Sequence, residues 1–142
     1  MRCIARLAIM ILAAAAGRTL ALAEDATATS APMSRGWQFT EQGGADLFSN
    51  VCAACHQPDA KGATGAAAYP PLAGDRKLAS ADFMLNVLFS GLKGMPPLGQ
   101  MMSDEQIVDI VDYVRTHFGN NYPSAVSVAQ VSAARRRAAP AP

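Results

Sequence analysis

A chain of 142 residues has room for one domain of ordinary size with extensions at its ends. The formal net charge is only +1 and 6% of the residues are aromatic, so the composition argues against a nucleic-acid-binding surface. Three cysteines are too few for a dense disulfide scaffold.

The N-terminus has the features of a secretory signal peptide. Arg2 and Arg6 form a short positive start, the apolar run 7–17 follows, and small residues before Glu24 offer a cleavage site. The apolar run is about half of the roughly 20 residues that a membrane-spanning helix needs. We therefore predict that residues 1–23 are removed on export, that the mature chain lies in the periplasm, and that it keeps no spanning segment.

Low-complexity composition marks both ends of the remaining chain. Residues 24–36 are rich in Ala, Thr, Ser and Pro, which predicts a flexible leader. Residues 121–142 are rich in Ala, Ser, Val and Pro and predict a flexible tail, in which 126–134 can form a short helix on a partner. The fold is therefore expected within residues 37–120.

Two helices are predicted in the first part of that region. The first is expected to begin after a cap at Thr40 and to run towards His56. The second covers 81–90, with Ser80 as its N-cap and Gly91 as its stop.

A third helix has the strongest signal. Ser103 and Gln106 form a capping box, apolar residues recur at helical spacing from Ile107, and Gly119 ends the pattern. No stretch alternates cleanly enough for a strand. We predict an all-α fold of three to four helices with Gly/Pro-rich loops, too small to be stable without a staple such as a buried cofactor.

Residues 52–56 read Cys-Ala-Ala-Cys-His, the C-x-x-C-H pattern of c-type haem attachment. On a helix Cys52, Cys55 and His56 project from one face, so both thiols can join a haem edge while the imidazole reaches the iron. We predict one covalent haem c with His56 as the proximal iron ligand. The alternatives are weaker, because zinc needs a fourth ligand, a thioredoxin-like pair needs a βαβ setting, and a simple disulfide leaves the core unfilled.

The sixth position on the iron is expected to be filled from the Gly/Pro-rich loop 91–99. Met95 stands at its centre, and a soft thioether suits iron in an apolar pocket and raises the reduction potential. Met102 is the second choice, although it precedes the Ser103 cap, where an apolar residue more often acts as a hydrophobic staple. Ligation by His117 would require that residue to leave the third helix.

The segment 69–72 is a candidate wall beside His56. A backbone carbonyl there would accept the second imidazole N–H, as metal-bound histidines generally require. From spacing alone, an ordinary rigid turn is an equally good interpretation of this segment.

Together these motifs resemble the class I (mono-haem) cytochromes c over about residues 40–120. Gly44 and Phe48 stand eight and four residues before Cys52, where that family has a glycine and an aromatic. The resemblance implies that they contact the last helix, at Ile110 and Tyr113.

The same resemblance bears on both haem faces. Pro70 and Leu72 match the family's P-x-L-x-G segment, which implies that they line the haem pocket and that the Pro70 carbonyl bonds His56. The Gly-Met-Pro run at 94–96 implies that Met95 is the axial ligand and that Met102 stands at the entry to the last helix.

The end at 113–120 and the Tyr-Pro-Pro-Leu segment look like cytochrome c subunits of bacterial periplasmic dehydrogenases. This implies an electron carrier and not an enzyme. The electrons would come from an exported dehydrogenase and pass to a downstream cytochrome or oxidase, towards the respiratory chain. If Met95 does not bind, the alternative is a five-coordinate haem protein acting as a small-ligand sensor or weak peroxidase. A third hypothesis is a permanently bound subunit whose tail, with its arginines at 135–137, clamps the partner.

Overall fold

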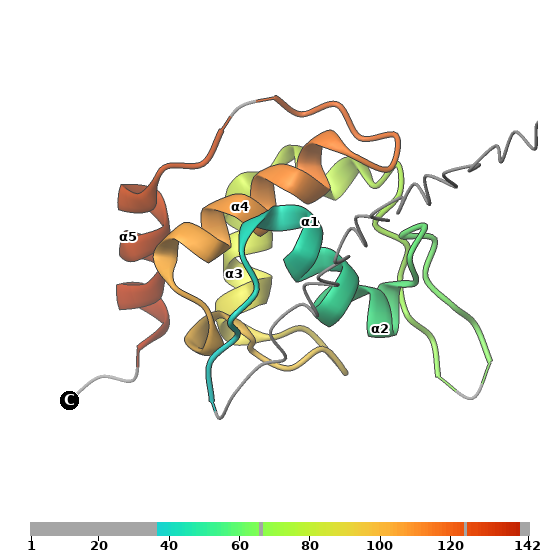
Figure 1. The fold of residues 1–142 in the computed structure, drawn as a ribbon, viewed down its shortest axis with the longest axis horizontal. Coiled ribbons are helices and arrows are strands. Elements are labelled where there is room, and N and C mark those ends of the chain that lie inside the picture. Colours follow the sequence, from blue (N-terminus) through green and yellow to red (C-terminus); the bar gives the residue numbers. More distant parts are fainter. Residues whose placement is uncertain (1–36, 66, 124, 140–142) are drawn as a thin grey trace, which may run out of the picture.

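The computed structural model describes residues 37–65, 67–123 and 125–139, so the predicted signal peptide (1–23) and leader (24–36) lie outside the described residues. Helices make up the regular structure of the described part, which otherwise contains two isolated β-bridges (Figure 1). The predicted all-α class is confirmed. Within the described ranges, none of the helices combines the length and apolar character needed to cross a bilayer.

Three consecutive elements form the first helical segment: α1 (Gly43–Leu47), the π-helical η1 (Phe48–Cys52) and α2 (Ala53–His56). The predicted start at Thr40 is wrong, because the N-cap position is Gln42. Gly43, the first residue of α1, has a φ of +78°, a left-handed conformation through which a right-handed helix cannot continue, so the helix does not extend back to Thr40.

The second predicted helix is confirmed as α3 (Ala81–Ser90), which follows the short 3₁₀ helix η2 (Arg76–Ala79). The Ser80 hydroxyl accepts a hydrogen bond from the Phe83 N–H at 3.2 Å, so the predicted N-cap is also present. Gly91, with a φ of +72°, ends the helix.

The third predicted helix is α4 (Asp104–Thr116), which follows η3 (Gly99–Met101) and carries the predicted capping box of Ser103 and Gln106. It ends at Thr116, before the predicted stop at Gly119. The Asn120 side chain donates to the Val114 carbonyl at 2.8 Å and so satisfies a carbonyl of the last turn.

The expectation of a flexible tail is corrected over α5 (Val128–Ala138), which packs against α3 and α4 of its own chain at the edge of the fold opposite α2 (Figure 1). Ser127 and Gln130 form a second capping box at its start. Val131 and Ala134, one turn apart, are buried against the domain. The helix therefore has a partner within the fold itself.

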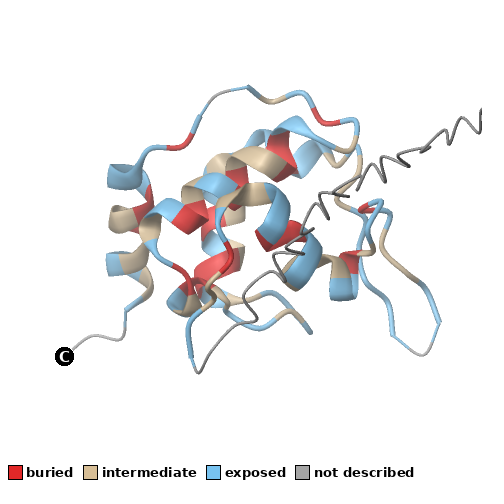
Figure 2. Ribbon diagram, in the orientation of Figure 1, coloured by how far each residue is buried: buried red, intermediate tan, exposed pale blue. Residues whose placement is uncertain are grey.

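The core lies between the helices, where their buried faces meet (Figure 2). Its largest fully buried side chains are Leu47, Leu85, Ile107, Val111, Val114 and Val131.

The crossing of α1 and α4 depends on Gly44. A Cβ atom on this residue would lie 2.3 Å from both the Asp109 carbonyl oxygen and the Tyr113 Cβ. The Phe48 ring lies beside the same crossing, with its centroid 6.0 Å from that of Tyr113. The contact of Gly44 and Phe48 with Tyr113 that the resemblance implies is therefore present.

Gly44→Ala is expected to lower the free energy of unfolding by about 3 kcal/mol, because both clashing atoms belong to a packed helix that cannot move aside locally. The measurement is a denaturant titration of the haem-loaded protein. Gly65→Ala is the matched control, since a Cβ there meets nothing within 4 Å. Equal denaturant midpoints for the two variants would contradict the conclusion that the crossing of α1 and α4 depends on Gly44.

Candidate haem-binding site

The two cysteines and the histidine lie at the end of the first helical segment. Cys52 is the last residue of η1, and Cys55 and His56 follow in α2, so the π-helical turn ends at the first residue of the motif. The segment ends at His56 because Gln57 takes a φ of +66°. The chain then turns away and leaves the face of the motif open to the loops that follow.

Both thiols of the motif are free, with Cys52 half-buried and Cys55 exposed. Burial raises the pKa of Cys52 to about 12, and the neighbouring Cys55 adds to the shift. The Cys52 thiol is therefore neutral at neutral pH, in surroundings that suit an uncharged thioether sulfur. Within the described residues, no three His, Cys, Asp or Glu side chains are grouped as ligands for a bare metal ion.

The imidazole of His56 is held in one orientation. Its Nδ1 lies 2.9 Å from the Pro70 carbonyl oxygen, and the ring is buried. Because a carbonyl can only accept, Nδ1 carries a hydrogen, and in the neutral imidazole Nε2 then keeps its lone pair. This is the tautomer that a histidine needs to bind a metal through Nε2, and the hydrogen bond implied by the family resemblance is confirmed.

The loop that carries Pro70 is folded closely back on the motif. Gly62 N–H donates to the His56 carbonyl at 2.9 Å, and a Cβ on Gly62 would lie 2.1 Å from the Tyr69 carbonyl oxygen. Leu72 N–H donates to the Ala60 carbonyl at 2.7 Å. These contacts hold the 69–72 segment beside His56, so the wall interpretation is favoured over an independent turn.

Asn120 is a supporting residue that the sequence analysis missed. Its Nδ2 donates to the Leu72 carbonyl at 3.0 Å and to the Val114 carbonyl at 2.8 Å, which ties the wall segment to the end of α4. The residue is buried, and its Oδ1 has no hydrogen-bond partner in the described part of the chain. Its position just after Gly119 at a helix end was the available signal.

Met95 lies in a tight turn. The N–H and carbonyl of Leu92 pair with the carbonyl and N–H of Met95, each at 3.0 Å, across a turn in which Lys93 has a φ of +53°. The Met95 side chain is half-buried and packs on the edge of the core. The loop thus presents a thioether from a short, pinned segment.

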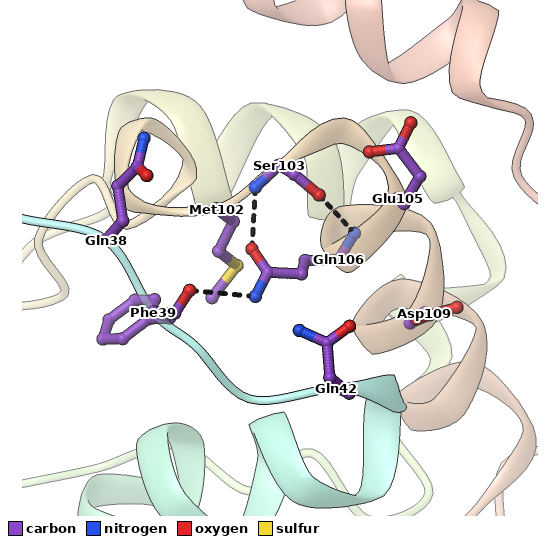
Figure 3. Close-up of a pocket in the computed structure, with 8 residues that line it drawn as sticks. All are labelled: Gln38, Phe39, Gln42, Met102, Ser103, Glu105, Gln106 and Asp109. Carbon is purple, nitrogen blue, oxygen red and sulfur yellow. Dashed lines mark hydrogen bonds between the residues drawn. The ribbon is translucent and has the colours of Figure 1, made fainter. Parts of the chain in front are cut away.

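The two rival ligands are engaged elsewhere. Met102 is only 4% exposed and lies in the core near Phe39 and Gln106, as the close-up shows (Figure 3). His117 is exposed, stacks on the Tyr113 ring with centroids 4.0 Å apart, and donates through Nδ1 to the Tyr113 carbonyl at 2.9 Å. In this structure both side chains are held by these contacts.

A cavity of about 300 Å³ lies beside the N-terminus of α4, and Met102 is the only one of its lining residues that was predicted as an iron ligand. Gln106 crosses this region, donating through Nε2 to the Phe39 carbonyl at 3.1 Å (Figure 3) and to the Glu41 carbonyl at 2.8 Å. The cavity thus lies where the segment at 38–42 meets the start of α4.

Apolar side chains are exposed beside the proposed ligands. Tyr69, which is 39% exposed, precedes Pro70 in the chain, and Leu92, which is 49% exposed, is hydrogen-bonded to Met95 through the backbone. The donor set is two free thiols and a buried imidazole that is held by a carbonyl. These residues fit a haem that is attached through the thiols and bound by the imidazole.

Comparison with known proteins agrees with this site. Residues 40–114 match the family model described as cytochrome c oxidase, cbb3-type, subunit III. The chain is 30% identical over 132 residues to the cytochrome c subunit of the quinone alcohol dehydrogenase of Gluconobacter oxydans, covering 84% of this chain and 27% of that protein. Its identity to the corresponding subunit of Gluconacetobacter polyoxogenes is 33% over 110 residues, covering 68% and 23%.

A third relative is the fructose dehydrogenase cytochrome subunit of Gluconobacter japonicus, with 38% identity over 107 residues, covering 63% of this chain and 22% of that protein. The chain thus spans about a quarter of the length of these relatives. The family model covers the whole of α1 to α3 and most of α4, including the C-x-x-C-H motif and the Met95 loop. The chain therefore belongs to this family of c-type cytochrome domains.

Proposed function

We propose that the chain binds one haem c covalently and transfers single electrons between redox proteins in the periplasm. Bound haem supplies a one-electron Fe(III)/Fe(II) couple, and the protein supplies attachment, axial ligands and an apolar pocket. The residues assigned to these roles are Cys52 and Cys55 for the thioethers, His56 and Met95 for the axial ligands, and Pro70 and Leu72 for the pocket.

The observation that carries the proposal is the hydrogen bond from His56 Nδ1 to the Pro70 carbonyl at the end of a C-x-x-C-H helix. It presents Nε2 as a fixed ligand and keeps the imidazole from turning. Met95 would supply the second axial ligand, and both proposed ligands come from segments held by hydrogen bonds. Ligands that stay in place when the iron changes charge keep the reorganisation small, which suits electron transfer.

The proposed electron donor is an exported dehydrogenase. The relatives are named as cytochrome subunits of alcohol, fructose and gluconate dehydrogenases, which supports this class of partner. The proposed acceptor is a downstream cytochrome or oxidase. The proposal includes export of the chain with cleavage of residues 1–23. The chain itself is proposed to carry electrons and to catalyse no substrate reaction.

The test is to purify the full chain from its native host through an affinity tag and to identify what accompanies it. We expect a dehydrogenase in the eluate and reduction of the haem when alcohols, fructose or gluconate are supplied, followed by the visible spectrum. A high-spin haem that binds carbon monoxide and is reduced by none of these would instead support the sensor or peroxidase alternative.

A further inference from the structure

One side chain of α5 bonds three residues of the stretch that runs from η3 to the start of α4. The Arg135 guanidinium donates through Nε to Asp104 Oδ1 at 2.8 Å, through Nη1 to the Gly99 carbonyl at 2.9 Å, and through Nη2 to the Met102 carbonyl at 2.8 Å. The arginine and aspartate side chains are 27% and 19% exposed. Such charge-assisted bonds, with one planar group reaching three acceptors, are among the stronger polar contacts in proteins.

The same guanidinium also lies on an aromatic ring. Its central carbon is 5.0 Å from the centroid of Phe89, in α3. Gly99 packs on the same ring so closely that a Cβ there would lie 2.6 Å from Phe89 Cδ1. Arg135 therefore holds Gly99 against α3, and its ion pair with Asp104 connects it to the first residue of α4.

The position of Gly99 bears on the Met95 loop, because Gly99 is where the loop ends. Its beginning is fixed at Gly91, where a Cβ would lie 2.7 Å from the Met95 carbonyl oxygen. Between Met95 and Gly99 stand Pro96, Pro97 and Leu98, and the rings of the two prolines fix φ at two of these three positions. This restricted connection is the route by which a shift of the segment at 99–102 would reach Met95.

We propose that Arg135 is a positioning residue for Met95: by holding the segment at 99–102, it keeps the methionine thioether at its place over the haem iron. The inference rests on the proposed function, in which Met95 is the distal ligand. In this inference α5 helps to keep Met95 bound to the iron, although α5 supplies no iron ligand itself.

The proposal has a thermodynamic consequence. An added ligand such as imidazole binds ferric iron only after Met95 has left, so its apparent affinity is scaled by the fraction of protein with the loop open. Loss of the Arg135 contacts raises that fraction. The affinity for imidazole therefore reports on the loop itself, whereas the free energy of unfolding reports on the whole domain.

The experiment compares full-length, haem-loaded wild type with Arg135→Ala, Arg135→Lys and Arg136→Ala. Imidazole is titrated into the ferric protein while the weak far-red methionine–iron band is followed, and unfolding by urea is measured in parallel. We expect imidazole to bind about tenfold more tightly to Arg135→Ala, the size expected if one charge-assisted hydrogen bond is felt fully at the loop.

Arg136→Ala is the matched control, since Arg136 is exposed and, among the described residues, bonds only Ser132 of its own helix at 3.3 Å. It should bind imidazole as the wild type does. Arg135→Lys keeps a cation beside Asp104 but cannot reach both carbonyls. It should give an intermediate affinity, and it serves as the deciding variant if Arg135→Ala does not fold.

Two results would overturn the inference, and they are distinguishable. If the wild type shows the band and the Arg135 variants lose stability while imidazole affinity stays at the wild-type value, Arg135 is a structural clamp only and Met95 ligation stands. If the wild type itself lacks the band, Met95 ligation fails and the role of Arg135 fails with it.

Discussion

Replacement of Cys52 and Cys55 together by alanine is expected to abolish covalent haem attachment. The thiols are the only groups in the described residues able to form thioether bonds, because both are free and no other cysteine occurs there. Haem-dependent staining of a denaturing gel measures the result, since only covalently bound haem survives denaturation. We expect the stained band to disappear from the double variant.

Cys3→Ala provides the matched control for the double variant. Cys3 is the remaining cysteine of the chain and stands in the predicted signal peptide, outside the described residues. Staining should be unchanged by this substitution. Retention of stain in the double variant, or its loss in the control, would show that haem is attached elsewhere.

The double variant also tests whether this small domain depends on bound haem for its stability. A domain this small buries a limited apolar core, and a bound cofactor adds partner surface that the chain alone lacks. Without attached haem, side chains such as Tyr69 and Leu92 lose that partner. We therefore expect the purified double variant to unfold at a lower urea concentration than the Cys3→Ala protein.

Prediction from the sequence succeeded where the signal was local. The caps of α3 and α4 are pairs of residues three positions apart, Ser80 with Phe83 and Ser103 with Gln106, so the bonds follow from the helix itself. The C-x-x-C-H spacing is local for the same reason. The hydrogen bond from His56 to Pro70 spans 14 positions. Spacing alone offered a carbonyl of the 69–72 segment as one of two equal interpretations, and the family resemblance named Pro70.

Prediction failed where a distant contact decides the structure. Ser127 and Gln130 give α5 the same kind of capping box as α4, yet the segment was expected to be mobile. The helix is held on the domain by the buried Val131 and Ala134 and by Arg135, whose partner Asp104 lies 31 positions earlier in the chain. The composition of the segment, poor in bulky apolar residues, did not indicate these contacts, because they depend on the surrounding fold.

Asn120 shows the same limit within the site. Its bond to the Leu72 carbonyl spans 48 positions, so no local pattern predicts it. Sequence reasoning therefore named the groups that are proposed to hold the haem. It missed the structural roles of two polar side chains: Asn120, which ties the C-terminal part of the chain to the 69–72 segment, and Arg135, which ties it to the segment at 99–102.

Met95→Ala is expected to remove the far-red band of the ferric protein and to leave the haem five-coordinate and able to bind carbon monoxide. The reduction potential should fall by on the order of 200 mV, since the choice of axial ligand tunes haem potentials over about 0.8 V and a thioether favours the reduced iron. Visible spectroscopy and a redox titration measure both effects. Met95 is half-buried in a loop, so the loss of packing is modest.

Met102→Ala is the matched substitution, because it removes the same side chain from the other candidate position. Met102 is 4% exposed in the core, so its truncation should cost about 2–4 kcal/mol of unfolding free energy while the far-red band and the potential remain. The two variants thus separate ligand loss from core loss. If the band vanished in Met102→Ala and persisted in Met95→Ala, the ligand would be Met102, and the segment at 99–102 would have to rearrange when haem binds.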